Sequence, residues 1–301
     1  MRVRRDECKG VGSLFRPDLQ PCGGQVGRKR FPTPLRGTPL RRRCGLTLVE
    51  LLISSAIMAM MAAALGTLAL AVTGGNQYSQ GQSAAAQHAR VALDRIRTAC
   101  LEAHASEEFP GFMVVSATAA GWSFPDTLVV WRPENTPPAD PDGLPLFREV
   151  VIFAPDPAAP NRLLEITAPG VNRQVPSPDN ASAWRAEIDA LVKQTTTQIT
   201  QLTNLVRTPQ IDSVTRRGAV RFHVVLRPSD DDWTGYQNGE LPWSELPWAQ
   251  SIRGTKVGLR QAWCRMELQL MPGEGATAID PEGDAALTFF GSAAIYYGMT
   301  P

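Results

Sequence analysis

The hydrophobic pattern of the chain is dominated by one long apolar run near its N-terminus. Residues 51–72 are 22 consecutive positions without a charged side chain, and no later segment is comparably long and apolar. At about 1.5 Å per residue a helix of this length spans about 33 Å, enough for one bilayer crossing. A cleaved secretory signal, with an alanine triplet at 84–86 as its cleavage site, and a plain single-pass anchor are the simpler alternatives. The run is too long for the first, so the pattern predicts one membrane-spanning helix.

Helical spacing continues beyond this run. Leu93, Ile96, Cys100 and Ala103 recur on one apolar stripe, with the neighbouring charged residues off it. The glycines between residues 74 and 81 weaken the helix and favour a bend or local melting there. The next proline is Pro110. We therefore expect one helix over about residues 46–105, with its first half in the membrane or a filament core and its second half against a head domain.

After Pro110 the pattern changes to short strand-like runs broken by Pro, Gly and Asp. Positions 262, 264, 266, 268 and 270 are apolar while 265, 267 and 269 are polar, as in a half-buried strand. The pattern predicts an α+β fold in which an antiparallel sheet cradles the helix. The predicted strands are residues 112–118, 127–132, 147–154, 162–167, 219–227, 259–271 and 286–297.

One segment of the head interrupts the strands. Residues 179–206 carry Trp184, Ile188, Leu191, Leu202 and Val206 at helical spacing, which predicts an amphipathic insertion helix near residues 180–206. Three consecutive threonines at 195–197 argue against a helix in its middle, because β-branched side chains lose rotamer freedom there.

The formal net charge of +1 is the average of two unlike parts. Residues 1–45 hold 12 Lys/Arg and 3 Asp/Glu (+9), and the remaining residues hold 18 and 26 (−8). Because cytoplasmic flanks of a membrane span are rich in Lys and Arg, residues 1–45 are expected in the cytoplasm and the head on the other side of the membrane. The net charge of −8 also argues against non-specific binding of nucleic acid.

The residues at the head of the apolar run form a distinctive combination. An intramembrane acid is costly and indicates a functional role with a partner, and Glu50 stands directly at the start of the span. The segment resembles the processing site of type IV pilins and type II secretion pseudopilins, which have a basic leader ending in Gly, a hydrophobic first mature residue, Thr-Leu, and Glu as the fifth mature residue. In this chain the matching residues are Arg41, Arg42, Arg43, Gly45, Leu46, Thr47, Leu48 and Glu50. Leu46 departs from the family, which usually has Phe at that position.

The resemblance implies a processing and assembly route. A prepilin peptidase would cut between Gly45 and Leu46 and methylate the new amine of Leu46. In a filament, the Glu50 carboxylate would face the Leu46 amine of a neighbouring subunit, and this pair would set the register between subunits because an unpaired buried charge is strongly penalised. The expected parts are a cleaved leader (1–45), a hydrophobic helix and stem (46–108) and a periplasmic or extracellular head (109–301). The expected partners are the peptidase, other pilin-like subunits and the inner membrane, without nucleic acid.

The order of elements is similar to that of the larger minor pseudopilins, in particular the J-type subunit of type II secretion. A minor type IV pilin and a lineage-specific pseudopilin remain alternatives. Two rival functions are a minor pilin whose head binds a ligand or DNA at a filament tip, and a membrane-anchored domain with an enzymatic or other function. The sequence contains no nucleophile elbow, zinc-type His-Glu-x-x-His, phosphate-binding glycine loop or dinucleotide fingerprint, so we expect no enzymatic activity and no required cofactor.

The remaining candidate sites are weaker. Cys100 and Cys264 each fall on an apolar face, so they are expected either to form a disulfide in an oxidising compartment or to be two buried free thiols. Two acidic turns are weak calcium candidates, although the first lacks a carboxylate at its closing position. The tryptophans at 233, 243, 248 and 263 are expected to form either a contact surface or the cover of a small core. The acidic turns contain Asp230, Asp232, Asp280, Glu282 and Asp284.

Overall fold

The computed structural model describes residues 46–133, 138–213, 215–251, 254–272 and 286–301. By Cα packing the chain divides into two compact units, Met1–Ala59 and Met60–Pro301, with the boundary inside the first helix. That helix, α1, runs from Leu48 to Leu101, close to the predicted bounds. It continues without interruption through the glycines at 74, 75 and 81, so the expected local melting is wrong.

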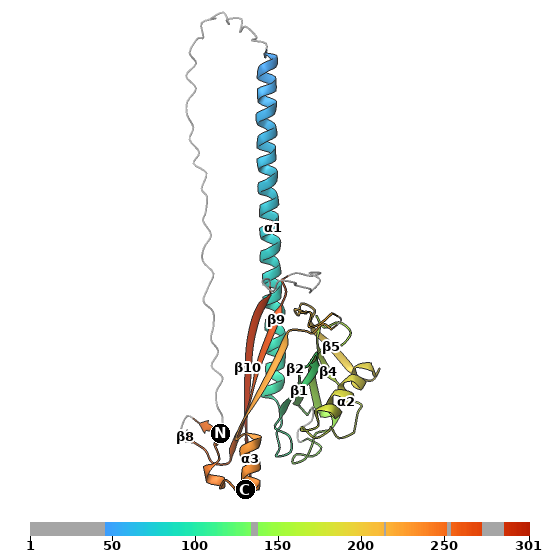
Figure 1. Ribbon diagram of the computed structural model, residues 1–301, viewed down its shortest axis with the longest axis vertical. Helices are drawn as coiled ribbons and strands as arrows, with labels where there is room; N and C mark the ends of the chain where they lie inside the picture. The colour runs from blue at the N-terminus through green and yellow to red at the C-terminus, as the bar shows by residue number, and fades with distance from the viewer. Residues whose placement is uncertain (1–45, 134–137, 214, 252–253, 273–285) are drawn as a thin grey trace, which may run out of the picture. The chain divides into compact units, whose positions relative to one another are not determined.

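In the second unit, the C-terminal part of α1 lies beside the sheets (Figure 1). It presents to them a narrow stripe of mostly small side chains. Ala85, Ala89 and Ala92 are fully buried, followed by Ile96 and Cys100. The spacing of three and four residues places these side chains on one face of the helix. Because alanine has only a methyl group, the backbone of α1 can approach the sheets closely.

A five-stranded antiparallel sheet follows the helix in chain order, β1-β2-β3-β4-β5. With the long apolar helix it forms an α+β, pilin-like layout, as the sequence predicted. Residues 150–154 of β3 are buried on both faces because the sheet is covered on both sides, which explains the continuous apolar run. The strands are β1 Phe112–Ala119, β2 Trp122–Trp131, β3 Val150–Pro155, β4 Leu163–Thr167 and β5 Gln198–Thr203, with the 3-10 turn η1 Phe147–Glu149 before β3.

A second antiparallel sheet has three strands in the order β10-β9-β6. Met266, Leu268 and Leu270 of β9 point toward the same core as the α1 stripe, as the alternation in the sequence predicted. A two-stranded ribbon and two short helical segments connect β6 with β9. The elements are β6 Val220–Arg227, α3 Asp230–Gln237, η2 Trp243–Glu245, β7 Gln250–Ser251, β8 Gly254–Thr255, β9 Leu259–Leu270 and β10 Leu287–Gly298.

The insertion after β4 is half helix and half strand. Helix α2 spans Ala181–Lys193 and buries Trp184, Ile188 and Leu191 against the face of the five-stranded sheet opposite α1. It ends before the three threonines, and Gln198–Thr203 forms β5. The prediction of a helix through residue 206 is therefore wrong, because the β-branched residues favour the extended backbone at the sheet edge.

Candidate functional site

The start of α1 is fixed by a reciprocal pair of hydrogen bonds. The backbone N–H and the hydroxyl of Thr47 donate to Oε2 of Glu50, at 2.9 and 3.1 Å. In return, the backbone N–H of Glu50 donates to the Thr47 hydroxyl at 3.2 Å. This is a capping box, in which residues three apart satisfy the free N–H groups of the first helical turn. The spacing Thr-x-x-Glu thus has a structural role that the sequence analysis did not identify.

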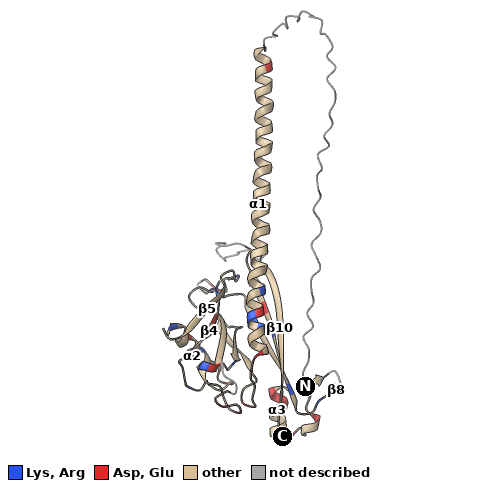
Figure 2. Cartoon of the chain, turned by 180° about the vertical axis from the view of Figure 1, so that it is seen from behind, with Lys and Arg blue, Asp and Glu red and all other residues tan. Residues whose placement is uncertain are grey.

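Glu50 is also the single acidic residue in the apolar half of α1. The helix carries no other charged residue before Arg90. Figure 2 shows the charged residues of α1 at its start and in the part beside the sheets. The side chains of residues 46–80 are exposed within the chain, on every face of the helix. An 18-residue window of this helix has a mean hydropathy of 2.1, which makes α1 the one described helix long and apolar enough to cross a membrane.

Leu46 precedes the cap residue and is 73% exposed. Its backbone therefore leads directly into the capping box at Thr47, while Gly45 and the basic residues Arg41, Arg42 and Arg43 lie outside the described residues. A carboxylate has two oxygens and accepts several hydrogen bonds. Glu50 therefore has the capacity to hold the cap of its own helix and to accept from an amine of another molecule at the same time.

Residues 40–66 match the model of the prokaryotic N-terminal methylation motif, which covers the basic cluster, the predicted cleavage site, the capping box and the first part of the apolar helix. With the long apolar helix, the motif makes the chain consistent with a type IV pilin-like protein. Proteins with this motif are structural, and the motif implies processing by prepilin peptidase, assembly with other pilins and anchoring in a membrane. Neither curated proteins nor solved structures gave a match to this chain.

The two cysteines predicted to share a core do so. Cys100 of α1 and Cys264 of β9 are both fully buried, and both thiols are free in this structure. Both belong to one hydrophobic core, and hydrogen bonding with Cys100, together with burial, raises the pKa of the Cys264 thiol well above its ordinary value. The structure therefore has the pair as two buried free thiols, and the disulfide stays a prediction.

The first acidic turn is a helix start and not a loop. Ser229 caps α3, and Asp232 completes a second capping box by accepting from the Ser229 backbone N–H at 2.9 Å. Asp230 accepts from the buried Arg260 guanidinium at 2.6 Å. These partners occupy two of the carboxylates that were weak calcium candidates. No group of three or more potential metal ligands lies among the described residues, and the second turn (Asp280, Glu282, Asp284) lies outside them.

The tryptophans separate into two environments. Trp243 packs edge to face with Trp233 and at a tilt against Trp248, and the three rings lie over a small core beside Met299. Arg260 stacks over Trp233, and burial raises the pKa of nearby Tyr297 to about 12. Trp263 is not part of this core. The expected cover of a small core therefore applies to three of the four tryptophans.

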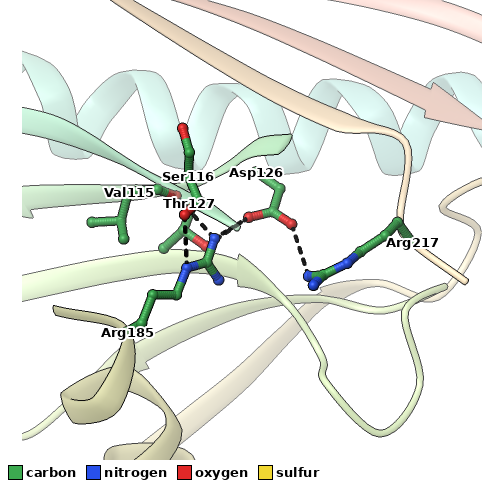
Figure 3. Close-up of polar contacts among 6 residues, drawn as sticks. All are labelled: Val115, Ser116, Asp126, Thr127, Arg185 and Arg217. Carbon is green, nitrogen blue, oxygen red and sulfur yellow. Dashed lines mark hydrogen bonds and ion pairs between the residues drawn. The ribbon is translucent and has the colours of Figure 1, made fainter. Parts of the chain in front are cut away.

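The sequence analysis missed a buried ion cluster that fixes α2 to the sheet (Figure 3). Asp126 at the middle of β2 is 2% exposed and accepts from Arg185 at 3.1 Å and from Arg217 at 3.4 Å. The Arg185 side chain also donates to the backbone carbonyls of Val115 and Ser116. The cluster lines a cleft of about 860 Å³ beside α2. A lone aspartate next to the apolar run of β2 was the available signal, because a carboxylate in a buried strand requires a partner.

Proposed function

We propose that the chain is a minor pilin-like subunit that a prepilin peptidase cleaves between Gly45 and Leu46. The enzyme then methylates the Leu46 amine, and the subunit assembles into a type II secretion pseudopilus or a type IV pilus. In this proposal residues 1–45 are the leader, residues 46–108 the membrane helix and stem, and residues 109–301 a periplasmic or extracellular head. The supporting observation is the capped Glu50 at the start of an otherwise uncharged apolar helix.

Cleavage would change the balance of forces on this helix. The arginines at 41–43 hold the helix start at the cytoplasmic surface of the membrane. Their removal leaves a positive α-amine at Leu46, four residues before Glu50, and the helix can leave the bilayer for a bundle of like helices. In that apolar bundle Glu50 requires a positive partner, since an unpaired buried charge is strongly destabilising. The amine of a neighbouring subunit supplies this partner and fixes the axial register.

Mass spectrometry of the N-terminal peptide, isolated from membranes of the native host, tests this proposal. We expect a peptide that starts at Leu46 and is one methyl group heavier than its sequence mass. An intact leader would contradict the proposed cleavage. A peptide starting just after the alanines at 84–86 would identify a secreted protein and would also contradict it.

A further inference from the structure

The three-stranded sheet has two unlike faces. Its inner face packs against the α1 stripe through residues such as Phe222, Met266 and Ala293. The strands pair in register, Val225 with Trp263 and Trp263 with Ala294, so the alternate residues of all three strands point away from α1. We call this side the outer face. Its principal side chains are Arg221, Arg227, Trp263, Arg265, Phe290 and Tyr296.

Large aromatic side chains are exposed on the outer face. Phe290 is 72% exposed, Tyr296 53% and Trp263 38%. Register and strand rise place Trp263 opposite Ala294, about 13 Å along β10 from Phe290 and about 7 Å from Tyr296. A hydrogen bond from Gln261 to the Tyr296 hydroxyl holds one ring in place. Exposed aromatic residues in such a group indicate an interaction site.

The other half of the outer face is basic. Arg221 and Arg227 of β6 and Arg265 of β9 are exposed, with His223 between the two β6 arginines. The Arg265 guanidinium lies over the Trp263 ring, 5.7 Å from its centroid, so the basic and aromatic halves meet there. On this face the three strands carry one acidic residue, Glu267, which pairs in register with Arg221. Residues 46–301 have a net charge of −8, so the fold has gathered positive charge on this face of a negative chain.

We propose that the outer face is a docking surface for an acidic surface of a neighbouring pilin-like subunit, a proposal that rests on the assembly function above. Tyr, Trp and Arg are the residues that dominate the energetics of protein interfaces. The partner brings carboxylates to the three arginines and an apolar strip to the three rings. A second copy offers the same face poor charge complementarity, because its outer face carries three arginines and Glu267 as the one acidic residue of the three strands. Nucleic acid fits less well, since Glu267 and the overall charge of −8 repel phosphates.

Site-specific photo-crosslinking of the full chain in its native host tests the surface. A benzoylphenylalanine at position 290 reports on the outer face. The matched control is the same residue at position 122, because Trp122 lies on the other sheet and is 70% exposed. We expect a crosslinked product from position 290, identified by mass spectrometry as a chain with its own N-terminal methylation motif and an acidic crosslinked peptide. Position 122 should give little of that product.

The charge requirement is tested in the same strain. Arg265→Glu should reduce the yield of the product by about fivefold or more, because charge reversal places like charges at the contact. Arg216→Glu, at an exposed arginine in the segment before β6 and outside the three strands, should leave the yield unchanged. Both variants must accumulate as processed chain, which excludes misfolding as the cause.

Several results would overturn the surface assignment. These are a nuclease-sensitive product, a product with a protein that lacks the motif, equal yields from positions 290 and 122, or no product from position 290 in a processed chain. Failure of the assembly function itself is distinguishable, since the N-terminal peptide would then retain its leader.

Discussion

At the scale of single residues, the Glu50 side chain combines two roles that substitutions can separate. It caps its own helix through Thr47, and in the proposed filament it pairs with an amine. Loss of the cap alone costs about 1 kcal/mol of helix stability, which a long helix in a membrane tolerates. Loss of the charge removes the partner of a buried amine, which costs more.

Two variants therefore have different expected outcomes. Glu50→Gln keeps an oxygen acceptor for the cap but loses the charge, so we expect normal cleavage and at least a tenfold lower recovery in sheared filaments, about the effect of 1.4 kcal/mol. Thr47→Ala keeps the charge and should retain most of the assembly. Immunoblotting of sheared filaments against total membranes measures both. Equal assembly of Glu50→Gln and the unmodified chain would remove the charge pair from the mechanism.

The buried thiols make a second prediction at this scale. A thiolate is the reactive form of cysteine, and the raised pKa of Cys264 keeps its thiol protonated. We therefore expect no labelling of Cys100 and Cys264 by iodoacetamide at pH 8 in the folded chain, read out on the peptides that contain them. Labelling after unfolding without a reductant identifies two free thiols, and labelling that requires a reductant identifies the predicted disulfide. Rapid labelling of the folded chain would contradict the burial of this pair.

At the scale of elements, helix α2 depends on the ion cluster around Asp126. Asp126→Ala would leave Arg185 and Arg217 without their shared carboxylate, while both arginines are partly open to water. We expect a loss of about 2–3 kcal/mol in the free energy of unfolding, somewhat less than for a fully buried pair. The matched control Asp189→Ala, at an exposed position of α2, should change it by less than about 0.5 kcal/mol. Thermal unfolding of the full chain in detergent measures both, and equal effects would contradict the anchoring role of Asp126.

A surface ion pair on the same helix predicts a dependence on pH. Hydrogen bonding to Arg173 lowers the pKa of Glu187 below its ordinary value. A carboxyl with a lowered folded pKa adds stability above its unfolded pKa, and the contribution disappears as the pH falls through the folded value. Glu187→Gln should therefore be less stable than the original chain at neutral pH and equal to it near pH 2. Melting temperatures over pH 2–7 test the convergence, and a constant difference would contradict it.

The sequence predicted the helices and strands better than it predicted which strands and side chains pair with one another. Residues 259–271 were recognisable as a strand because apolar and polar positions alternate along them, and α1 because of its length. Leu202 and Val206 matched helical spacing by coincidence, and only the sheet edge at β4 determined that Gln198–Thr203 is a strand. Arg95 and Glu165 form a bidentate ion pair across 70 residues. Pairs of this kind depend on the folded chain, and neither local pattern nor motif contains them.

At the scale of the whole molecule, the distribution of charge carries most of the functional argument. The leader is strongly basic and the head is acidic, with the uncharged apolar run of residues 51–72 between them. The methylation motif accounts for the basic cluster and the apolar run that follows it. The basic outer face, in contrast, could not be predicted from the net charge. Arg221, Arg227 and Arg265 lie up to 44 positions apart in the sequence, and the register of β6 and β9 brings them onto one surface.

The same charge distribution predicts the orientation in the membrane. Because Lys and Arg near a span remain in the cytoplasm, the end of the chain at Pro301 should lie on the opposite side. An alkaline phosphatase fused after Pro301, which is active only outside the cytoplasm, should therefore be active in cells, and the same enzyme fused before Met1 should be inactive. Replacing Arg41, Arg42 and Arg43 by Asn should reduce the activity of the first fusion, with the basic residues farther upstream retaining part of it. An inactive fusion at Pro301 beside an active one at Met1 would reverse the orientation, and a peptidase acting from the cytoplasm could then no longer reach the bond between Gly45 and Leu46.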